Sequence, residues 1–164
     1  MLVEIRVSNF ALIEDLTLRF KPGLNVLSGE TGAGKSIIIG AINLLLGERA
    51  ATDQIRQGEE GAFVEGIFEG PALCLPEIET LLEEAGIENG ETLIVAREVS
   101  RNGRSVGRVN GRAMPIFFLK ELGELLVDLH GQHQHQSLLR PGYHLELLDL
   151  FGGERAAAAR RRVE

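Results

Sequence analysis

The stretch "GETGAGKS", Gly29 to Ser36, decides how this 164-residue chain is interpreted. It matches the pattern G-x-x-x-x-G-K-S, and it lies between a short apolar run, Leu24–Ser28, and residues that favour a helix, Lys35–Leu46. Glycines let the backbone curl until successive N–H groups converge on phosphate oxygens, and the following helix adds the positive end of its dipole. The pattern therefore predicts a phosphate-binding loop rather than a flexible connector.

Each residue type in this loop suits the binding of a nucleotide. Lys35 would bring a full positive charge to the β- and γ-phosphates, and the Ser36 hydroxyl would bind Mg²⁺. No guanine-reading "NKxD" stretch occurs, which argues against a GTPase. We assign nucleotide binding to nine residues and a catalytic contribution to the lysine among them: Gly29, Glu30, Thr31, Gly32, Ala33, Gly34, Lys35, Ser36 and Ile37.

Composition sets outer limits on the class of protein. Twenty-four acidic residues against 17 basic ones give a net charge of −7, which argues weakly against non-specific coating of DNA. Apolar runs are far shorter than the roughly 20 residues that a membrane span needs. The single cysteine, Cys74, rules out an internal disulfide framework, and Glu4 argues against a signal peptide. These features predict a cytoplasmic protein with no membrane partner.

Periodicity and turn signals predict a mixed α/β chain. Apolar alternation indicates strands, Asn-Gly pairs indicate hairpin turns, and Pro and Gly mark where helices begin and end. We expect strands at Leu2–Asn9, Glu14–Phe20, Leu24–Ser28, Val64–Phe68, Thr92–Val99, Arg104–Val109 and Leu125–Leu129, with helices at Lys35–Leu46, Pro76–Ala85 and Pro115–Leu126 and a further helix that continues to Glu164.

Five arginines crowd into 16 residues around the predicted hairpin, with only one acid, Glu98, among them; they are Arg97, Arg101, Arg104, Arg108 and Arg112. Strand alternation places Arg104 and Arg108 on one face, and Arg112 could extend that line. Three guanidiniums in a row could contact DNA phosphates without reading sequence. The alternative is a solvated face whose arginines pair with acids on neighbouring strands, such as Glu4, Glu14, Asp15 or Glu98.

A phosphate-binding loop does not by itself define what happens to the nucleotide. Asp128 in "ELLVDLHG" follows three apolar residues, so it could hold Mg²⁺ in a self-contained P-loop phosphotransferase. The spacing of His130, His133 and His135 suggests a metal site, but structural zinc prefers four ligands that often include cysteine, and no cysteine lies near. We therefore expect these imidazoles to face solvent or to support other groups.

Several segments together resemble the RecN family, DNA-repair ATPases of the chromosome-maintenance (SMC-like) ABC group. They are "LSGETGAGKSI", "LLLGERA", "IRQGEEGAFVEGIFE", "SRNGRSVGRVNGR" and "LHGQHQHQSLL", and they extend over the chain up to about Leu150. The resemblance implies an α/β ABC-type ATPase head with an N-terminal antiparallel β-subdomain. Such heads are split in sequence, so residues 1–150 would form the N-terminal lobe and 151–164 the start of a coiled-coil arm.

The resemblance also implies roles and partners. It makes Gln132, rather than Asp128, the neighbour of Mg²⁺ and of the attacking water, and it brings Arg49 and above all Arg56 near the γ-phosphate or DNA; plain surface charge is the alternative for these two arginines. ATP would be sandwiched between two heads, and its hydrolysis would drive head engagement in double-strand-break repair and recombination at the nucleoid. Partners would be the C-terminal lobe, a second head and DNA. Because no "LSGGE"-like signature occurs, we expect the chain alone to hydrolyse little ATP.

Overall fold

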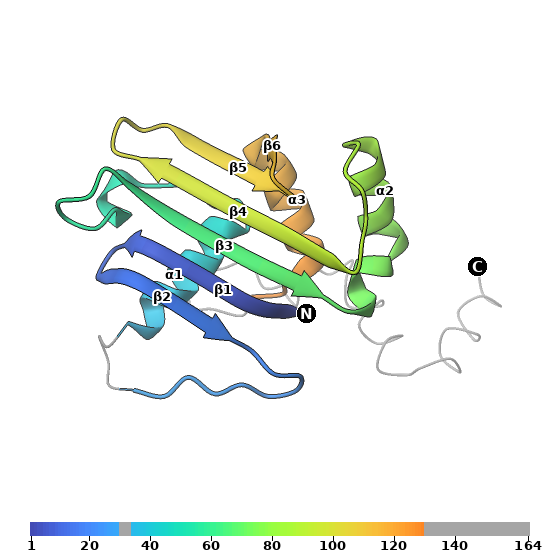
Figure 1. Cartoon of the computed structure of the whole chain (residues 1–164), viewed down its shortest axis with the longest axis horizontal. Coiled ribbons are helices and arrows are strands. Elements are labelled where there is room, and N and C mark those ends of the chain that lie inside the picture. Colours follow the sequence, from blue (N-terminus) through green and yellow to red (C-terminus); the bar gives the residue numbers. More distant parts are fainter. Residues whose placement is uncertain (30–33, 130–164) are drawn as a thin grey trace, which may run out of the picture. The chain divides into compact units, whose positions relative to one another are not determined.

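The computed structural model describes residues 1–29 and 34–129, and Met1–Val127 form a compact unit. Its centre is a six-stranded antiparallel sheet in the order β2-β1-β3-β4-β5-β6 (Figure 1). The strands are β1 Leu2–Phe10, β2 Ile13–Arg19, β3 Gly61–Glu69, β4 Thr92–Ser100, β5 Ser105–Val109 and β6 Arg112–Met114; the helices are α1 Lys35–Leu45, α2 Pro76–Glu84 and α3 Ile116–Leu126, with short 3₁₀ turns η1 Thr52–Gln54 and η2 Pro71–Cys74.

Most of the predicted elements are present within a residue or two of their expected ends. Two differences concern the hairpins. The β4–β5 connection is residues 101–104 rather than a two-residue turn. The N–H of Gly103, which has φ +81°, closes the turn by donating to the Ser100 carbonyl. Beyond it, Asn110 and Gly111 both have positive φ, and the tight turn that they form adds the unexpected strand β6.

Two predicted strands are wrong. Residues 24–29 and 127–129 have no regular structure, although Leu24–Ser28 and Leu125–Leu129 both read as apolar strands. A strand requires a neighbour that satisfies its N–H and C=O groups, and the described part of the chain supplies none at either place. The first two residues of the second segment belong instead to α3, which continues to Leu126.

Helices α1 and α3 cover one face of the sheet, and glycines in the strands leave room for their side chains. A Cβ on Gly66 of β3 would lie 2.5 Å from the Leu45 side chain of α1, and one on Gly107 of β5 would lie 2.6 Å from Leu119 of α3. The strand register puts both glycines on the same face. Bulky helix side chains thus fill the space that these strands leave empty, and Leu45 and Leu119 are almost fully buried.

The two helices also meet each other at the point where α1 ends. Gly47, at φ +91°, donates to the Leu44 carbonyl, and Glu48 donates to the Asn43 carbonyl, so α1 closes with a Schellman motif as its glycine predicted. A Cβ on Gly47 would lie 2.6 Å from the backbone nitrogen of Lys120 in α3. The backbones therefore touch directly, and this contact sets where α1 lies.

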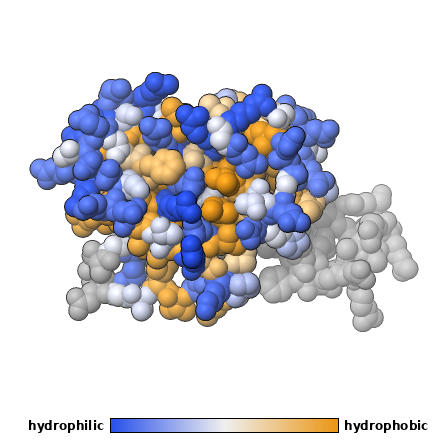
Figure 2. Space-filling model, in the orientation of Figure 1, coloured by the Kyte–Doolittle hydropathy of each residue, from blue (hydrophilic) through white to orange (hydrophobic). Residues whose placement is uncertain are grey.

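The other face of the sheet carries charged side chains among apolar ones (Figure 2). Glu4 accepts from Arg19 at 2.6 Å and from Arg6 at 2.7 Å, and Arg6 continues to Glu65 at 3.5 Å. The hydrogen bond from Arg19, aided by Arg6, holds the pKa of the Glu4 carboxyl below its ordinary value of 4.5. This network ties β2, β1 and β3 together on the face that the helices leave open.

We expect Gly47→Ala to destabilise the fold by about 3 kcal/mol or more, because it adds a collision with the α3 backbone to the strain of a positive φ. Gly58→Ala is the matched control: it has φ +95° but nothing within 4 Å of a built Cβ, so it should cost only about 1–2 kcal/mol. Urea unfolding of both variants measures the difference. Equal losses would mean that the helices do not meet at Gly47.

Glu4→Gln should lower stability at neutral pH, and the loss should disappear in acid. A carboxyl with a lowered pKa stabilises the fold above its unfolded pKa, and that contribution is lost as pH falls through its folded pKa. Unfolding measured between pH 7 and pH 3 therefore tests the network. Glu98→Gln serves as the control, since Glu98 is exposed and has no ion pair in the described residues. A pH-independent difference at Glu4 would contradict the prediction.

Candidate functional site

The predicted phosphate loop ends where α1 begins. Gly34, in the left-handed region at φ +94°, is the N-cap, and its carbonyl accepts from the N–H groups of Ile37 and Ile38 at 3.0 Å. No side chain caps this helix start and its first turn holds no acid. The positive end of the helix dipole is therefore not neutralised by a carboxylate of its own first turn, which suits it to an anion.

Lys35 and Ser36 occupy the first two positions of this helix. Ser36 is exposed, and the Lys35 ammonium donates to the carbonyl of Gly29. That contact joins Gly29, which opens the pattern, to the first residue of α1. Glu30, Thr31, Gly32 and Ala33 lie outside the described residues, so their roles stay predictions.

The segment that leads into the loop leaves its apolar side chains exposed. Leu24 is 91% exposed and Val26 76%, while Asn25 is held back to the preceding turn by accepting from the Lys21 N–H at 3.0 Å and donating to the Lys21 carbonyl at 2.7 Å. Several large apolar side chains that are exposed next to one another are unusual at a protein surface. In the described part of the chain nothing covers them.

The arginine hairpin divides between the two faces of the sheet. Arg108 lies opposite Ala96 and Ala113 on the open face, and Arg104, exposed in the loop, precedes it by four residues. Arg112 lies opposite Val109 on the other face, and its guanidinium donates to the Gly86 carbonyl at 2.7 Å. The line of three arginines is thus wrong for Arg112, because the turn at Asn110-Gly111 changes the pairing register. None of the three makes an ion pair among the described residues.

The remaining candidates are Arg56, Arg49, Asp128 and the residues that follow it. Arg56 donates to the Leu12 carbonyl at 2.9 Å and pairs with Glu14 at 3.3 Å, so it ties its loop to the β1–β2 turn. Arg49 is exposed, and Asp128 is exposed beyond the compact unit that ends at Val127. Gln132, His130, His133, His135 and the predicted arm 151–164 lie outside the described residues.

The sequence predicted that Arg97 lies on the surface with the other hairpin arginines, and this prediction is wrong. It is only 2% exposed and lies on the face covered by the helices, opposite Val64 and Gly107. Burial lowers the pKa of its guanidinium. A signal for this was present in the sequence, because Arg97 stands two residues from both Val95 and Val99 and therefore shares their side of the strand.

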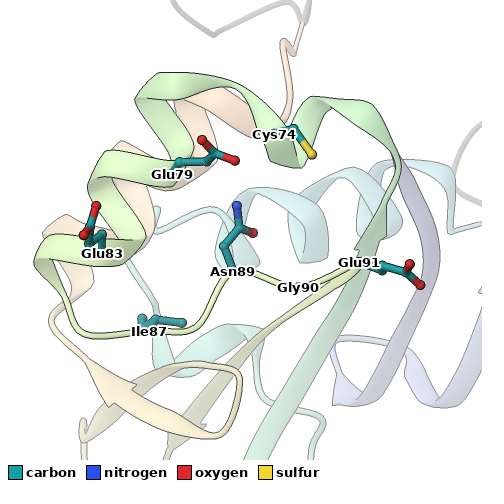
Figure 3. A pocket seen from close by; sticks show the side chains of 7 residues that line it. All are labelled: Cys74, Glu79, Glu83, Ile87, Asn89, Gly90 and Glu91. Carbon is teal, nitrogen blue, oxygen red and sulfur yellow. The ribbon is translucent and has the colours of Figure 1, made fainter.

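A hollow of the described surface lies elsewhere, beside α2 (Figure 3). It measures about 570 Å³ and is lined by Cys74, Glu79, Glu83, Ile87, Asn89, Gly90 and Glu91. Residues 69–91 hold seven glutamates and no basic residue, so the chain's other 17 acids equal its 17 basic residues. A phosphate would be repelled here, which leaves the start of α1 as the better anion site.

No group of metal-binding side chains occurs in the described residues, and none of their helices is long and apolar enough to cross a membrane.

Comparisons with known proteins agree with this geometry. Residues 4–161 match the family model described as AAA domain. The chain is 46% identical over 163 residues to DNA repair protein RecN of Bacillus subtilis (strain 168), and 40% identical over 153 residues to the RecN of Vibrio cholerae serotype O1. These matches cover 97% and 93% of this chain but only 27% of each relative, so the chain spans about a quarter of their length.

Solved structures identify the fold. A structure reported under ATP-driven dimerization and DNA-stimulated activation of SMC ATPases superposes with a TM-score of 0.62 at 20% identity, covering 76% of this chain and 78% of the other. The SMC head domain from Thermotoga maritima gives a TM-score of 0.56 at 26% identity, covering 73% and 41%. The predicted fold class, a P-loop α/β head of the ABC ATPase type with an antiparallel β-subdomain, is confirmed.

Proposed function

This chain belongs to the AAA domain family, and from that membership and its resemblance to RecN we propose that it binds ATP with Mg²⁺ at the start of α1. Gly29–Ile37 would surround the phosphates, Lys35 would bind the β- and γ-phosphates, and Ser36 would bind Mg²⁺. The observation that carries the proposal is the helix start itself. It presents a left-handed glycine, a lysine and an exposed serine at an N-terminus that no side chain caps.

Hydrolysis would require groups beyond the described residues. Gln132 would lie next to Mg²⁺ and the attacking water, and a C-terminal lobe would supply the signature and carboxylate that this sequence lacks. The exposed Leu24, Val26 and Leu27 support such a lobe, because an apolar strand beside the loop would bury them by pairing with it. On this proposal 1–150 is the N-terminal lobe and 151–164 begins the coiled-coil arm.

In the cell, ATP binding would bring two such heads together and hydrolysis would release them during double-strand-break repair and recombination. The RecN relatives are named as DNA repair proteins, and this supports a role at the nucleoid in the cytoplasm. For DNA contact we retain Arg108, which lies on the open face of the sheet, and Arg104, which is exposed in the loop before β5. The acidic segment 69–91 would repel DNA from the α2 end of the molecule.

Lys35→Ala should weaken ATP binding at least about tenfold while the protein stays folded, because charge-assisted hydrogen bonds contribute roughly 1.5–3 kcal/mol. Calorimetric titration of the full-length protein with Mg–ATP provides the measurement. Lys21→Ala is the matched control, since Lys21 is exposed and its hydrogen bonds with Asn25 use only its backbone. Undiminished ATP binding by a folded Lys35→Ala protein would reject the nucleotide site.

Replacing both Arg104 and Arg108 by Gln should weaken DNA binding and flatten its dependence on salt by roughly one unit for each lost phosphate contact. Binding of a duplex to the full-length protein is measured over a series of salt concentrations. Arg112→Gln should leave the slope unchanged, because Arg112 lies on the other face and donates to Gly86. An unchanged slope in the double variant would place DNA binding elsewhere.

A further inference from the structure

The buried guanidinium of Arg97 joins two elements that otherwise have different roles. Its Nε donates to the Ser105 hydroxyl at 2.9 Å, and its Nη2 donates to the Glu48 carbonyl at 3.5 Å. Ser105 begins β5 directly after Arg104, and Ser105 in turn donates to the Glu98 carbonyl at 3.3 Å. Glu48 is the residue whose N–H completes the C-terminal cap of α1. Arg97 therefore extends from the arginine hairpin to the end of the helix that begins at the phosphate loop.

Stability alone gives no reason for an arginine here. Its neighbours on the same face of β4 are the buried Val95 and Val99, so an apolar side chain would suit the position. The third nitrogen, Nη1, is buried without a hydrogen-bond partner in the described part of the chain. A buried donor left unpaired costs free energy. What the guanidinium adds is a cation and a directed donor at the carbonyl end of α1.

That end of the helix is otherwise without a cation of its own. The last turn of α1 contains no basic residue, and its carbonyls carry the negative end of the helix dipole. Arg97 meets this end from the sheet, next to the place where Gly47 touches the α3 backbone. Arg97 thus adds a polar contact to the steric contacts that hold the far end of α1.

We propose that Arg97 is a positioning residue for the nucleotide site. It holds the C-terminal end of α1 in place, so that the N-terminal end of the helix stays directed at the phosphates. This inference rests on the proposed binding of ATP at Lys35. Because α1 has 11 residues and is about 16 Å long, a tilt of roughly 4° at the held end displaces the other by about 1 Å. A displacement of that size is enough to impair a site built from convergent donors.

The test compares ATP affinity at matched stability in the full-length protein. Arg97→Met removes both donors, Arg97→Lys keeps the charge but cannot reach two acceptors, and Ser105→Ala removes the fixed partner in the hairpin. Leu82→Ala is the control, because Leu82 is fully buried in α2, so its loss destabilises the fold, and it takes no part in the hydrogen bonds of Arg97. All variants are titrated with Mg–ATP well below their unfolding temperatures.

We expect Arg97→Met to weaken ATP binding about fivefold to tenfold, Arg97→Lys and Ser105→Ala to fall between it and the unmodified protein, and Leu82→Ala to stay within about twofold. If Arg97→Met does not fold, the other two variants decide. Affinities within twofold for every Arg97 and Ser105 variant, together with a loss of stability like that of Leu82→Ala, would overturn the inference.

Hydrogen exchange separates failure of the inference from failure of the proposed function. If the unmodified protein bound no ATP, the proposed site would be wrong, but exchange of the Leu46, Gly47 and Glu48 amides would still report how firmly α1 is held. Arg97 variants should exchange there at least about tenfold faster than Leu82→Ala does. Equal exchange would overturn the role of Arg97 whatever ATP does.

Discussion

The direct contact between the backbones of α1 and α3 determines most of the architecture. A glycine at each side of the contact makes it possible, since Gly47 touches Lys120 and a Cβ on Gly123 would lie 2.9 Å from Leu46. With the helices this close, Leu45 and Leu119 both reach the sheet, at strand glycines that leave room for them. The position of α1, and with it the direction in which the phosphate loop faces, follows from this packing rather than from the loop itself.

The two ends of α1 are suited to charges of opposite sign. Its N-terminus has no acid nearby in the first turn and is suited to a phosphate, whereas its C-terminus receives a buried arginine from β4. The negative charge of the chain is concentrated in residues 69–91, which include α2 and the wall of the hollow beside it. A polyanion would therefore approach the molecule from the side away from α2.

Local signals predicted well those features that depend on a few neighbouring residues. The pattern from Gly29 to Ser36 needs only its glycines and the following helix, and the Schellman cap needs only Gly47, so both could be predicted from the sequence. Asn-Gly pairs likewise predicted that the chain turns. The exact length of the β4–β5 loop depends on how the two strands pair, and the same is true of β6, so neither was predicted.

The sequence by itself determined the candidate nucleotide site, the fold class and the approximate ends of most elements, because glycine geometry and apolar periodicity are local properties. Only the tertiary structure decided that Leu24–Ser28 has no strand partner among the described residues, that Arg112 faces away from Arg108, and that the helices cover the face of β4 on which Arg97 lies. Each of these depends on which strand lies beside which and on which face the helices cover. Those are long-range facts, and a single sequence carries no signal for the pairing that produces them.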